Sequence, residues 1–577
     1  MNTSEQRRTT VEALRATREH PLDVLVVGGG IVGAGIARDA ALRGFRVGLV
    51  EQRDLASGTS SRPTRLIHGG LRYLENYDFG LVREDLRERE ILLRVAPHLV
   101  FPLPFLLPQY GRSQAYQAKL SAGMLLYDLL SYDKSLPSRR WLSREQLLAT
   151  EPGIDPEGLQ GAWRYYDAQV PYVERLVVEN ALDAAAHGAH ILTHARVERF
   201  LRQSGTAGTV TGALVRDTLG GGELEVRAHL TINATGPWLD RTDGEIRPGR
   251  PPLLRLTKGV HLVTPPGTRH AHVLFSQTDG RLFFVVPWHG CSLVGTTDTD
   301  YHGDPADAAA DQEDVTYLST EARRAFPQAP FDQVHYTWAG VRALGRVEGV
   351  QEGKVSRKHK LLDHEAREGV PGIVSVVGGK ITAYRGIAEE VGDLVSTKLG
   401  RTTRGYTDRR PFPGGTLGQS ADLASFVATE LRPRALSLGL DAAQAERLGR
   451  LYGALAHEVL DLAERDRGLA ERLAPGSLAV AAELARAIDR EWTITLPDFL
   501  LRRSDLGLNA DQALPHLDAI ATRMAALCGW DATDTDAQVA AYRAELDPMR
   551  RLSSSSEGRA VPGDRTARRP GLVAAGG

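Results

Sequence analysis

The sequence predicts an α/β fold with a second, α+β domain and an all-helical C-terminal domain. A strand, a glycine-rich turn, a helix and a second strand follow one another over residues 22–50. Residues 251–300 alternate between apolar and polar side chains, which is typical of an antiparallel sheet. From about residue 417 onward, alanine, leucine and arginine recur with helical periodicity, which predicts a separate helical domain.

The first of these segments, DVLVVGGGIVGAGIARDAALRGFRVGLVEQ, begins at Asp23 and carries glycines spaced as G-x-G-x-x-G. Gly28 allows a tight turn, Gly30 lets the backbone approach a pyrophosphate, and Gly33 lets helix and strand pack closely. The pyrophosphate would lie at the helix N-terminus, where free N–H groups and the helix dipole favour anions. Glu51, at the end of the second strand, is placed to accept hydrogen bonds from adenosine ribose hydroxyls. The motif predicts dinucleotide binding and does not by itself separate FAD from NAD.

The composition narrows the class of protein. At 577 residues, 42% of them hydrophobic, the chain is long enough for roughly three to four domains. The 70 Lys and Arg residues balance 72 Asp and Glu, and this net charge of −2 gives no support for a nucleic-acid partner. Cys291 and Cys528 belong to no paired motif, which excludes a disulfide framework, a cysteine-ligated cluster and a redox cysteine pair. His289 and Cys291 lack further ligands in the pattern, so no metal site is expected.

The order of the patterns divides the chain into domains. Strand, glycine turn and helix recur in GIVSVVGGKITAYRGIAEEVGDLVSTKL, so the first domain is expected to be discontinuous. The expected parts are a flexible N-terminus (1–20), the nucleotide domain (21–75, 155–250 and 340–404), a substrate domain (76–154 and 251–339), a linker (405–416), the helical domain (417–550) and a disordered tail (551–577).

Three separated stretches, VGGGIVGAGIARDAALRG, SSRPTRLIHGGLRYLE and GGKITAYRGIA, resemble the FAD-dependent glycerol-3-phosphate dehydrogenases. NATGPW, GTTDTDY, AGVRAL and REWTITLPDFLLRRSDLGL extend the resemblance over most of the chain from residue 21 to about residue 530. Ala383 departs from the family pattern, which more often has a small hydroxyl residue or glycine there. The resemblance implies a glutathione-reductase-like, Rossmann-type FAD-binding domain, beside which lie a sheet-containing substrate domain and the helical domain. It favours FAD as the cofactor.

The resemblance also implies which residues meet the cofactor. Lys380 would place positive charge beside the reduced, anionic flavin, which would stabilise it. The expected cofactor-binding residues are Gly28, Gly30, Gly33, Glu51, Ser61, Thr64, His68, Val197, Gly236, Gly378, Gly379, Lys380 and Thr382.

The implied substrate, sn-glycerol 3-phosphate, is oxidised at C2 to dihydroxyacetone phosphate by hydride transfer to flavin N5. Its phosphate dianion needs guanidinium groups, which match phosphate geometry bidentately. Arg342 in AGVRAL is the first candidate for this role, with Arg72, Tyr73 and Arg357 as further substrate-binding residues at matching family positions. Any one of these arginines, taken alone, is also compatible with a solvated surface charge.

Loss of the hydroxyl proton needs a general base. His261 in TKGVHLV occupies the family's candidate position, and neutral imidazole has a suitable pKa. Taken alone, a histidine on a half-buried strand is more often a packing residue. Lys258 and Lys380 compete for the same role, so the expected catalytic residues are His261, Arg342 and Lys380.

The family passes its electrons either to membrane quinone or, in its oxidase branch, to oxygen. The oxidase branch generally carries an extra insertion, which is not recognised in this sequence. This favours quinone as the electron acceptor, and with it peripheral attachment to the cytoplasmic face of the cell membrane. The helix expected around residues 112–130, with Arg112 and Lys119 at one end, would lie on that surface or pack into the core. A homodimer is compatible with the sequence. The alternatives are an oxygen-dependent oxidase of glycerol 3-phosphate, an amine or a hydroxy acid on the same fold, and a non-catalytic flavin-binding protein.

Overall fold

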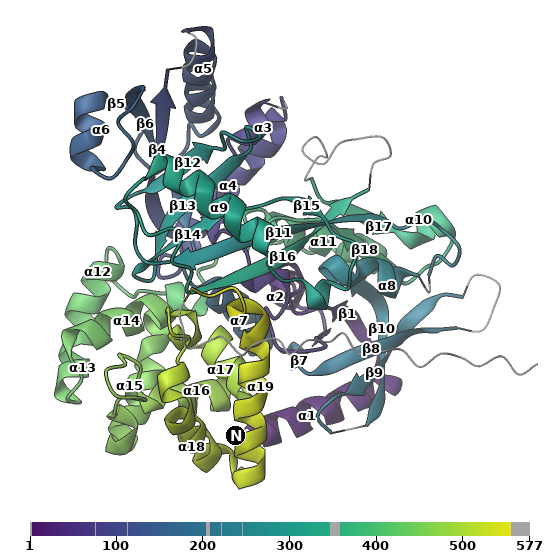
Figure 1. Ribbon diagram of the computed structural model, residues 1–577. Helices are drawn as coiled ribbons and strands as arrows, with labels where there is room; N and C mark the ends of the chain where they lie inside the picture. Colours follow the sequence, from purple (N-terminus) through teal and green to yellow (C-terminus); the bar gives the residue numbers. More distant parts are fainter. Residues whose placement is uncertain are drawn as a thin grey trace, which may run out of the picture.

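The computed structural model describes residues 3–75, 77–111, 114–203, 208–220, 222–244, 246–346 and 358–554. Two sheets and a helical domain make up this part of the chain (Figure 1). The helical domain, green to yellow in Figure 1, lies at the lower left in that view, whereas α5 and α6 project at the top.

The first sheet has parallel strands at its centre, in the order β18-β10-β1-β2-β7. Its parallel strands are β1 (Leu22–Val27), β2 (Val47–Val50), β7 (His190–Leu192), β10 (Glu223–Asn233) and β18 (Ile373–Val377). Antiparallel strands β8 (Ala195–Arg202), β9 (Val210–Asp217) and β17 (Lys360–Asp363) extend it. Parallel strands that are buried on both faces require mostly apolar residues, as in β1 and β18.

Small residues let helix α2 (Ile31–Leu42) pack tightly on this sheet and on helix α11 (Tyr384–Lys398). A Cβ at Gly33 would lie 1.9 Å from the carbonyl oxygen of Gly28, and one at Gly35 would lie 2.9 Å from the ring of Tyr384. Any larger side chain at either position would therefore push the helix away from its neighbours. The other helices around this sheet are α1 (Thr3–Arg15), α7 (Val173–Ala186), α8 (Leu239–Asp243) and α10 (His364–Glu368).

The second sheet is mostly antiparallel, in the order β15-β11-β14-β13-β12-β4-β6-β3, with β16 paired to β11 and β5 to β6. Its strands are β3 (Leu66–Ile67), β4 (Phe101–Tyr110), β5 (Arg140–Ser143), β6 (Leu159–Gln169), β11 (Leu254–Thr264), β12 (Ala271–Phe275), β13 (Leu282–Trp288), β14 (Cys291–Gly295), β15 (Thr299–Asp300) and β16 (Tyr336–Gly345). Helices α3 (Arg72–Glu75), α4 (Phe79–Val95), α5 (Gln114–Leu130), α6 (Arg144–Thr150) and α9 (Gln312–Ala325) accompany it.

The predicted domain boundaries at residues 155 and 340 are misplaced. Strand β6 begins after residue 155 and belongs to the second sheet, where it pairs with β4, and β16 continues past residue 340 in the same sheet beside β11. The apolar pattern of a strand is the same whichever sheet it joins, so the sequence does not reveal this assignment.

The N-terminal residues form helix α1, not the flexible segment that the sequence led us to expect. Leu14 is fully buried, and the helix packs on β7 and β10. Arg7 donates hydrogen bonds to the carbonyl oxygen of Thr193 at 2.7 Å and to Asp217 at 2.7 Å. These tertiary contacts stabilise a helix whose own sequence is too polar to predict it.

The helical domain consists of α12 (Leu423–Phe426), α13 (Arg432–Ser437), α14 (Ala442–Tyr452), α15 (Ala456–Arg465), α16 (Ala481–Arg490), α17 (Leu496–Arg502), α18 (Leu517–Cys528) and α19 (Ala532–Arg550). The expected linker, residues 405–416, is a packed connection, because the ring of Phe412 is buried beneath the guanidinium group of Arg38. At the start of the expected tail, Ser554 hydrogen-bonds to Val334, and residues 555–577 lie outside the described part of the chain.

Candidate active site

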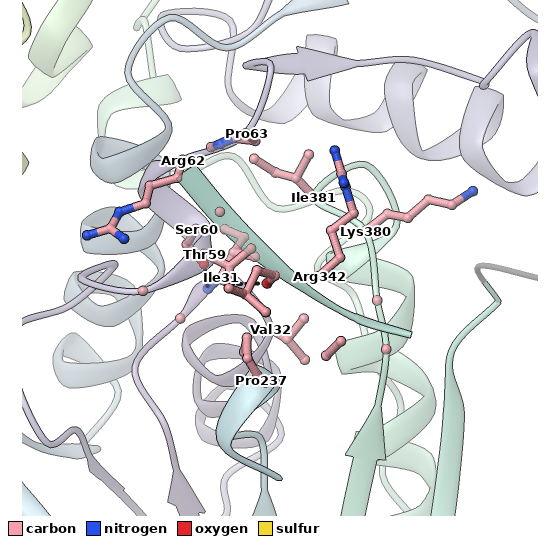
Figure 2. A pocket seen from close by; sticks show the side chains of 18 of the residues that line it. Ile31, Val32, Thr59, Ser60, Arg62, Pro63, Pro237, Arg342, Lys380 and Ile381 are labelled. Carbon is pink, nitrogen blue, oxygen red and sulfur yellow. Dashed lines mark hydrogen bonds between the residues drawn. The ribbon is translucent and has the colours of Figure 1, made fainter. Parts of the chain in front are cut away.

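A cavity of about 650 Å³ lies between the carboxyl ends of the parallel strands and strands β11, β13 and β16 of the second sheet. Ligand sites of open α/β sheets form at this edge. In Figure 2, Arg62 lies on one side of the cavity and Arg342 and Lys380 lie on the other. Residues that are up to about 350 positions apart in the chain therefore meet in one space.

The glycine turn between β1 and α2 forms one wall of the cavity. Gly28 has φ +110°, and a Cβ there would lie 2.6 Å from the carbonyl oxygen of Ala234, so only glycine fits. Helix α2 begins after Gly30 without a side-chain cap, and the backbone N–H of Ile31 donates to Oγ of Ser60 at 2.9 Å (Figure 2). This helix N-terminus faces the cavity and is suited to an anion such as a pyrophosphate.

Glu51 lies at the end of β2, as expected, and lines the cavity. Its Oε2 accepts from the backbone N–H of Gly29 at 2.6 Å and its Oε1 from that of Arg53 at 2.9 Å. Burial raises the pKa of Glu51, while these two hydrogen bonds act in the opposite direction. Val197 on β8 and Gly236, with φ +57°, line the cavity from neighbouring segments.

The turn after β18 forms a second backbone wall. Gly378 and Gly379 have φ +74° and +128°, and both line the cavity. Beyond them, Nζ of Lys380 lies 2.7 Å from Oδ2 of Asp85 and 3.8 Å from the centre of the Tyr73 ring. The hydroxyl of Thr382 accepts from the backbone N–H of His68 at 3.2 Å, which joins this turn to the loop before α3.

His261 lines the cavity from strand β11 and is almost fully buried. Its Nε2 lies 2.8 Å from Oγ1 of Thr64, whereas its Nδ1 has no hydrogen-bond partner among the described residues. Burial lowers the pKa of His261 well below its ordinary value, and the positive charges of Arg342 and Arg65 lower it further. Both effects favour the neutral form of the ring, which is the form that can accept a proton.

Arg342 reaches the cavity from β16, across the strand pair with β11. A Cβ at Gly259 would lie 2.2 Å from Nη2 of Arg342, so the glycine leaves the space that the guanidinium group occupies. Nη1 donates to Oδ1 of Asp298 at 2.9 Å, and Nη2 donates to Oγ1 of Thr296 at 2.8 Å. The guanidinium group is therefore held in a fixed orientation at the cavity wall.

Comparisons with known proteins agree with this geometry. Residues 23–385 match the FAD dependent oxidoreductase family, and residues 406–535 match the C-terminal domain of alpha-glycerophosphate oxidase. A glycerol-3-phosphate dehydrogenase of Synechocystis sp. is 37% identical over 91% of this chain and 96% of that protein. An aerobic glycerol-3-phosphate dehydrogenase of Staphylococcus haemolyticus is 35% identical over 88% and 91%. This chain belongs to the FAD-dependent glycerol-3-phosphate dehydrogenase family.

The structure of a member of this family is known with FAD. The glycerol-3-phosphate dehydrogenase from Bacillus halodurans, complexed with FAD, superposes with a TM-score of 0.76 at 29% identity and covers 95% of this chain and 98% of that one. The cavity of the present family member fits the same cofactor: it offers a helix N-terminus for the pyrophosphate and a carboxylate for the ribose, and Lys380 also lines it.

Two residues that the sequence placed in the dehydrogenase site lie elsewhere. Ser61 turns away from the cavity, because its hydroxyl donates to the carbonyl oxygen of Gly58 at 3.1 Å within a short helical turn. Lys258, the competing proton acceptor, does not line the cavity and is paired with Asp311 and Asp314.

The described part of the chain does not cover two further candidates. Arg72 begins helix α3, but its side chain is not among the parts that the structure describes. Arg357 lies wholly outside the described residues.

Several residues that line the cavity were not predicted, among them Ser60, Arg62, Arg281 and Phe284. Arg281 is the most informative, because its Nη1 donates to the carbonyl oxygen of Asp298 at 2.6 Å, and the side chain of Asp298 also holds Arg342. An arginine that directly precedes an apolar strand in RLFFVVPW is the signal that could have identified it.

Proposed function

We propose that this protein oxidises sn-glycerol 3-phosphate to dihydroxyacetone phosphate with FAD and passes the electrons to membrane quinone. One observation carries the proposal: Arg342, Lys380 and the neutral His261 line the same cavity as the glycine turn. A phosphate anchor and a proton acceptor are therefore available beside a dinucleotide site.

The substrate phosphate is assigned to the end of the cavity that holds Arg342 and Arg281. Asp298 accepts from both guanidinium groups, one through its side chain and the other through its carbonyl oxygen. It thereby holds the two guanidinium groups in one region, where both line the cavity that would take the phosphate. Lys380 supplies a third cation. Its charge is partly neutralised by Asp85, with which it forms an ion pair.

The hydroxyl proton at C2 is assigned to His261. Its Nε2 faces the hydroxyl of Thr64, which also lines the cavity, so a proton can reach Nε2 directly or through Oγ1 of Thr64. FAD, when bound, supplies the acceptor for the hydride that leaves C2. Burial lowers the pKa of His261, which favours the neutral form of the ring but also makes it a weaker base.

Membrane contact is assigned to the projecting region around α5, at the top of Figure 1. Leu125 and Leu129 lie one helical turn apart on α5 and are 46% and 61% exposed, and Tyr132 just beyond the helix is 78% exposed. An apolar face of this kind suits the surface of a bilayer. Within the described residues, no helix combines the length and apolarity that crossing a membrane requires. We therefore propose peripheral attachment at the cytoplasmic face.

Anaerobic addition of sn-glycerol 3-phosphate to the purified protein tests the oxidation. We expect rapid bleaching of the flavin absorbance in the wild type, strongly slowed bleaching in Arg342→Ala, and wild-type bleaching in the control Arg523→Ala, a partly exposed arginine of the helical domain. A wild-type flavin that stays oxidised would overturn the proposal. Fast turnover with oxygen, and none with a soluble quinone analogue, would identify oxygen as the electron acceptor in place of quinone.

Sedimentation with vesicles that contain anionic lipid tests the membrane contact. The double variant Leu125→Gln/Leu129→Gln should lose binding, whereas Leu436→Gln, an equally exposed leucine of the helical domain, should keep it. Equal binding by both variants would assign the membrane surface to another part of the chain.

A further inference from the structure

We propose that the helical domain fixes the adenosine-binding loop, residues 51–57, and that FAD affinity depends on this contact. Asp54 of the loop is held by Arg502 and Arg503 of the helical domain, which act as positioning residues. The inference rests on the proposed placement of FAD, with its adenosine end at Glu51.

The loop is part of the cavity wall. Glu51, Arg53 and Ser57 line the cavity, and Gly29 of the glycine turn donates to Glu51. Farther along the loop, the backbone N–H of Ala56 donates to the carbonyl oxygen of Gly29 at 3.0 Å. A shift of the loop would therefore move both the ribose carboxylate and the turn that is to hold the pyrophosphate.

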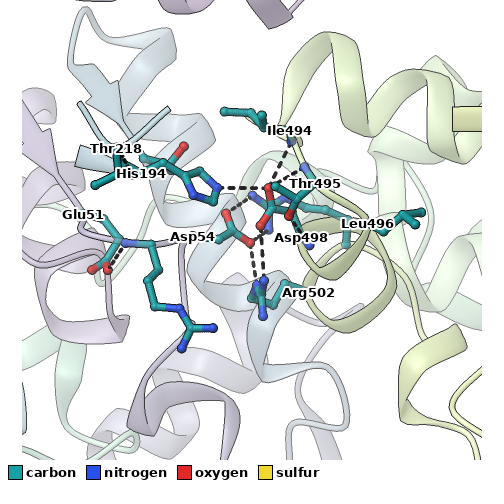
Figure 3. Close-up of polar contacts among 12 residues, drawn as sticks. Glu51, Asp54, His194, Thr218, Ile494, Thr495, Leu496, Asp498 and Arg502 are labelled. Atoms are coloured by element: carbon teal, nitrogen blue, oxygen red, sulfur yellow. Dashed lines mark hydrogen bonds and ion pairs between the residues drawn. The ribbon is translucent and has the colours of Figure 1, made fainter. Parts of the chain in front are cut away.

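Asp54 itself points away from the cavity and is completely buried. Oδ2 accepts from Nε of Arg502 at 2.6 Å (Figure 3) and from Nη1 of Arg503 at 2.9 Å, and Oδ1 accepts from Nη2 of Arg503 at 2.6 Å. Both arginines lie at the C-terminal end of α17, about 450 residues farther along the chain. Charge-assisted bonds of this geometry are among the strongest that a protein makes.

A second path joins the same two domains. Nε2 of His194 lies 3.1 Å from Oδ2 of Asp498, the first-turn carboxylate of α17, and the backbone N–H of His194 donates to the carbonyl oxygen of Arg53 at 2.6 Å (Figure 3). Arg502 also donates to Asp498 at 3.2 Å, so the contacts form a closed ring from the loop through His194 and α17 back to Asp54.

The last helix completes the cluster. Oε1 of Glu545 on α19 accepts from Arg502 at 2.9 Å, and Oε2 accepts from Arg53 at 3.1 Å. Arg53 lines the cavity, so this contact runs directly from the helical domain to a residue of the nucleotide site. The nearby charges alternate in sign, and removal of one partner leaves a buried charge uncompensated.

The affinity for FAD depends on the fraction of molecules in which the loop has its binding geometry. If the loop holds its binding geometry for only a fraction of the time, the apparent dissociation constant for FAD rises by the inverse of that fraction. Loss of the three hydrogen bonds on Asp54 should therefore weaken FAD binding by about tenfold or more, while the distant active-site end of the cavity keeps its residues.

FAD titration of the apoprotein, followed by flavin fluorescence, tests the inference. Asp54→Asn keeps the side-chain volume and removes the charge, and Arg503→Lys keeps the charge and removes the bidentate contact. Both should raise the Kd for FAD at least tenfold. Tyr336→Phe is the matched control, because it removes another buried contact between a sheet and the helical domain, the 2.6 Å bond from Oη to the carbonyl oxygen of Leu508. Its Kd for FAD should stay within twofold of the wild type.

The temperature of FAD release and the temperature of unfolding, measured separately, distinguish a positioning role from general destabilisation of the protein. Flavin fluorescence reports release of FAD, and far-ultraviolet circular dichroism reports unfolding. In Asp54→Asn the release temperature should fall well below the unfolding temperature, whereas in Tyr336→Phe the two should move together. If Asp54→Asn and Arg503→Lys do not fold, Glu545→Gln, a partly exposed member of the cluster, should still raise the Kd at least threefold.

The outcomes distinguish this inference from the function on which it rests. A wild-type apoprotein that does not bind FAD would overturn the cofactor placement itself. A wild type that binds FAD, with folded variants of Asp54, Arg503 and Glu545 that bind it equally well, would overturn the positioning role and leave the cofactor placement intact. Equal weakening in Tyr336→Phe would also overturn it, because any loosening of the domain contact would then suffice.

Discussion

Nζ of Lys380 lies 2.7 Å from Oδ2 of Asp85, a carboxyl group that is completely buried and whose Oδ1 has no hydrogen-bond partner in the described part of the chain. Burial raises the pKa of Asp85 to about 7, although the charge of Lys380 acts in the opposite direction. Above about pH 7 the pair is neutral overall, and below it Asp85 is protonated and the charge of Lys380 stands alone. The positive charge at this end of the cavity therefore depends on pH.

Asp85→Asn should remove this dependence. In the wild type, the Kd for glycerol 3-phosphate, obtained from the rate of anaerobic flavin reduction, should rise as the pH increases through about 7, because the charge of Lys380 becomes neutralised. In the variant the low-pH affinity should persist above pH 7. The control Asp133→Asn, which loses an exposed pair with Arg83, should titrate like the wild type. A variant that keeps the wild-type profile would assign the titration to another group.

Substitutions of Arg342 and of Gly259 should both weaken binding of the substrate phosphate. Arg342→Lys keeps the charge and loses the bidentate geometry, which should cost about 2–3 kcal/mol and raise KM for glycerol 3-phosphate roughly 30- to 160-fold. Gly259→Ala should act in the same direction, because the added methyl group would overlap with Nη2 of Arg342. Gly123→Ala, which has open space around it, is the control. An unchanged KM in Arg342→Lys would exclude this residue as the phosphate anchor.

The sequence predicts the nucleotide half of the site better than the substrate half. Local chemistry determines the glycine turn: Gly28 needs a positive φ, Gly33 needs close packing, and both requirements follow from their spacing. Arg281 reaches the cavity only because β13 lies near the loop that carries Asp298, and no spacing in the sequence encodes that pairing. The sequence predicted Ser61 in place of Ser60 for a similar reason, since successive side chains in such a turn point in directions about 120° apart.

The same limit applies to the fold. The strand patterns of β6 and β16 are recognisable, but the choice between two sheets depends on contacts made by distant segments. Helix α1 is too polar to be predicted and forms because Arg7 and Leu14 find partners on the first sheet. Helices of the C-terminal domain are predicted more readily, because their apolar periodicity is local.

Glu491 should make the helical domain sensitive to acid. It is completely buried and accepts from Arg175 at 2.6 Å. Burial opposes its ionisation, but the charges of Arg175 and Arg486 lower the pKa of Glu491 to about 2. Since this pKa is depressed on folding from 4.5, the stabilisation is complete above about pH 4.5 and is lost as the pH falls towards 2. The shift corresponds to about 3 kcal/mol.

Urea unfolding of Glu491→Gln measures this contribution. At pH 7 the variant should be less stable than the wild type by about 3 kcal/mol or more, because two buried arginines lose their counter-charge. The difference should shrink as the pH falls from 5 to 2. Glu471→Gln, which loses an exposed pair with Arg523, should differ from the wild type by less than about 1 kcal/mol at every pH. A difference that is independent of pH would mean that Glu491 acts through packing alone.

His261→Gln should slow flavin reduction more than it weakens substrate binding. A positioned general base contributes roughly 100- to 10,000-fold to a rate, so the limiting rate of anaerobic bleaching should fall within that range while FAD stays bound. Thr64→Val removes the hydroxyl beside Nε2 and should slow the reaction less, by about tenfold, because the imidazole itself remains.

Since burial and the charge of Arg342 lower the pKa of His261, protonation should not slow the wild type near pH 6.5 but only at a clearly more acidic pH. His302→Gln, an exposed histidine, serves as the control. A limiting rate in His261→Gln within threefold of the wild type would move the role of base to Lys380 or to solvent.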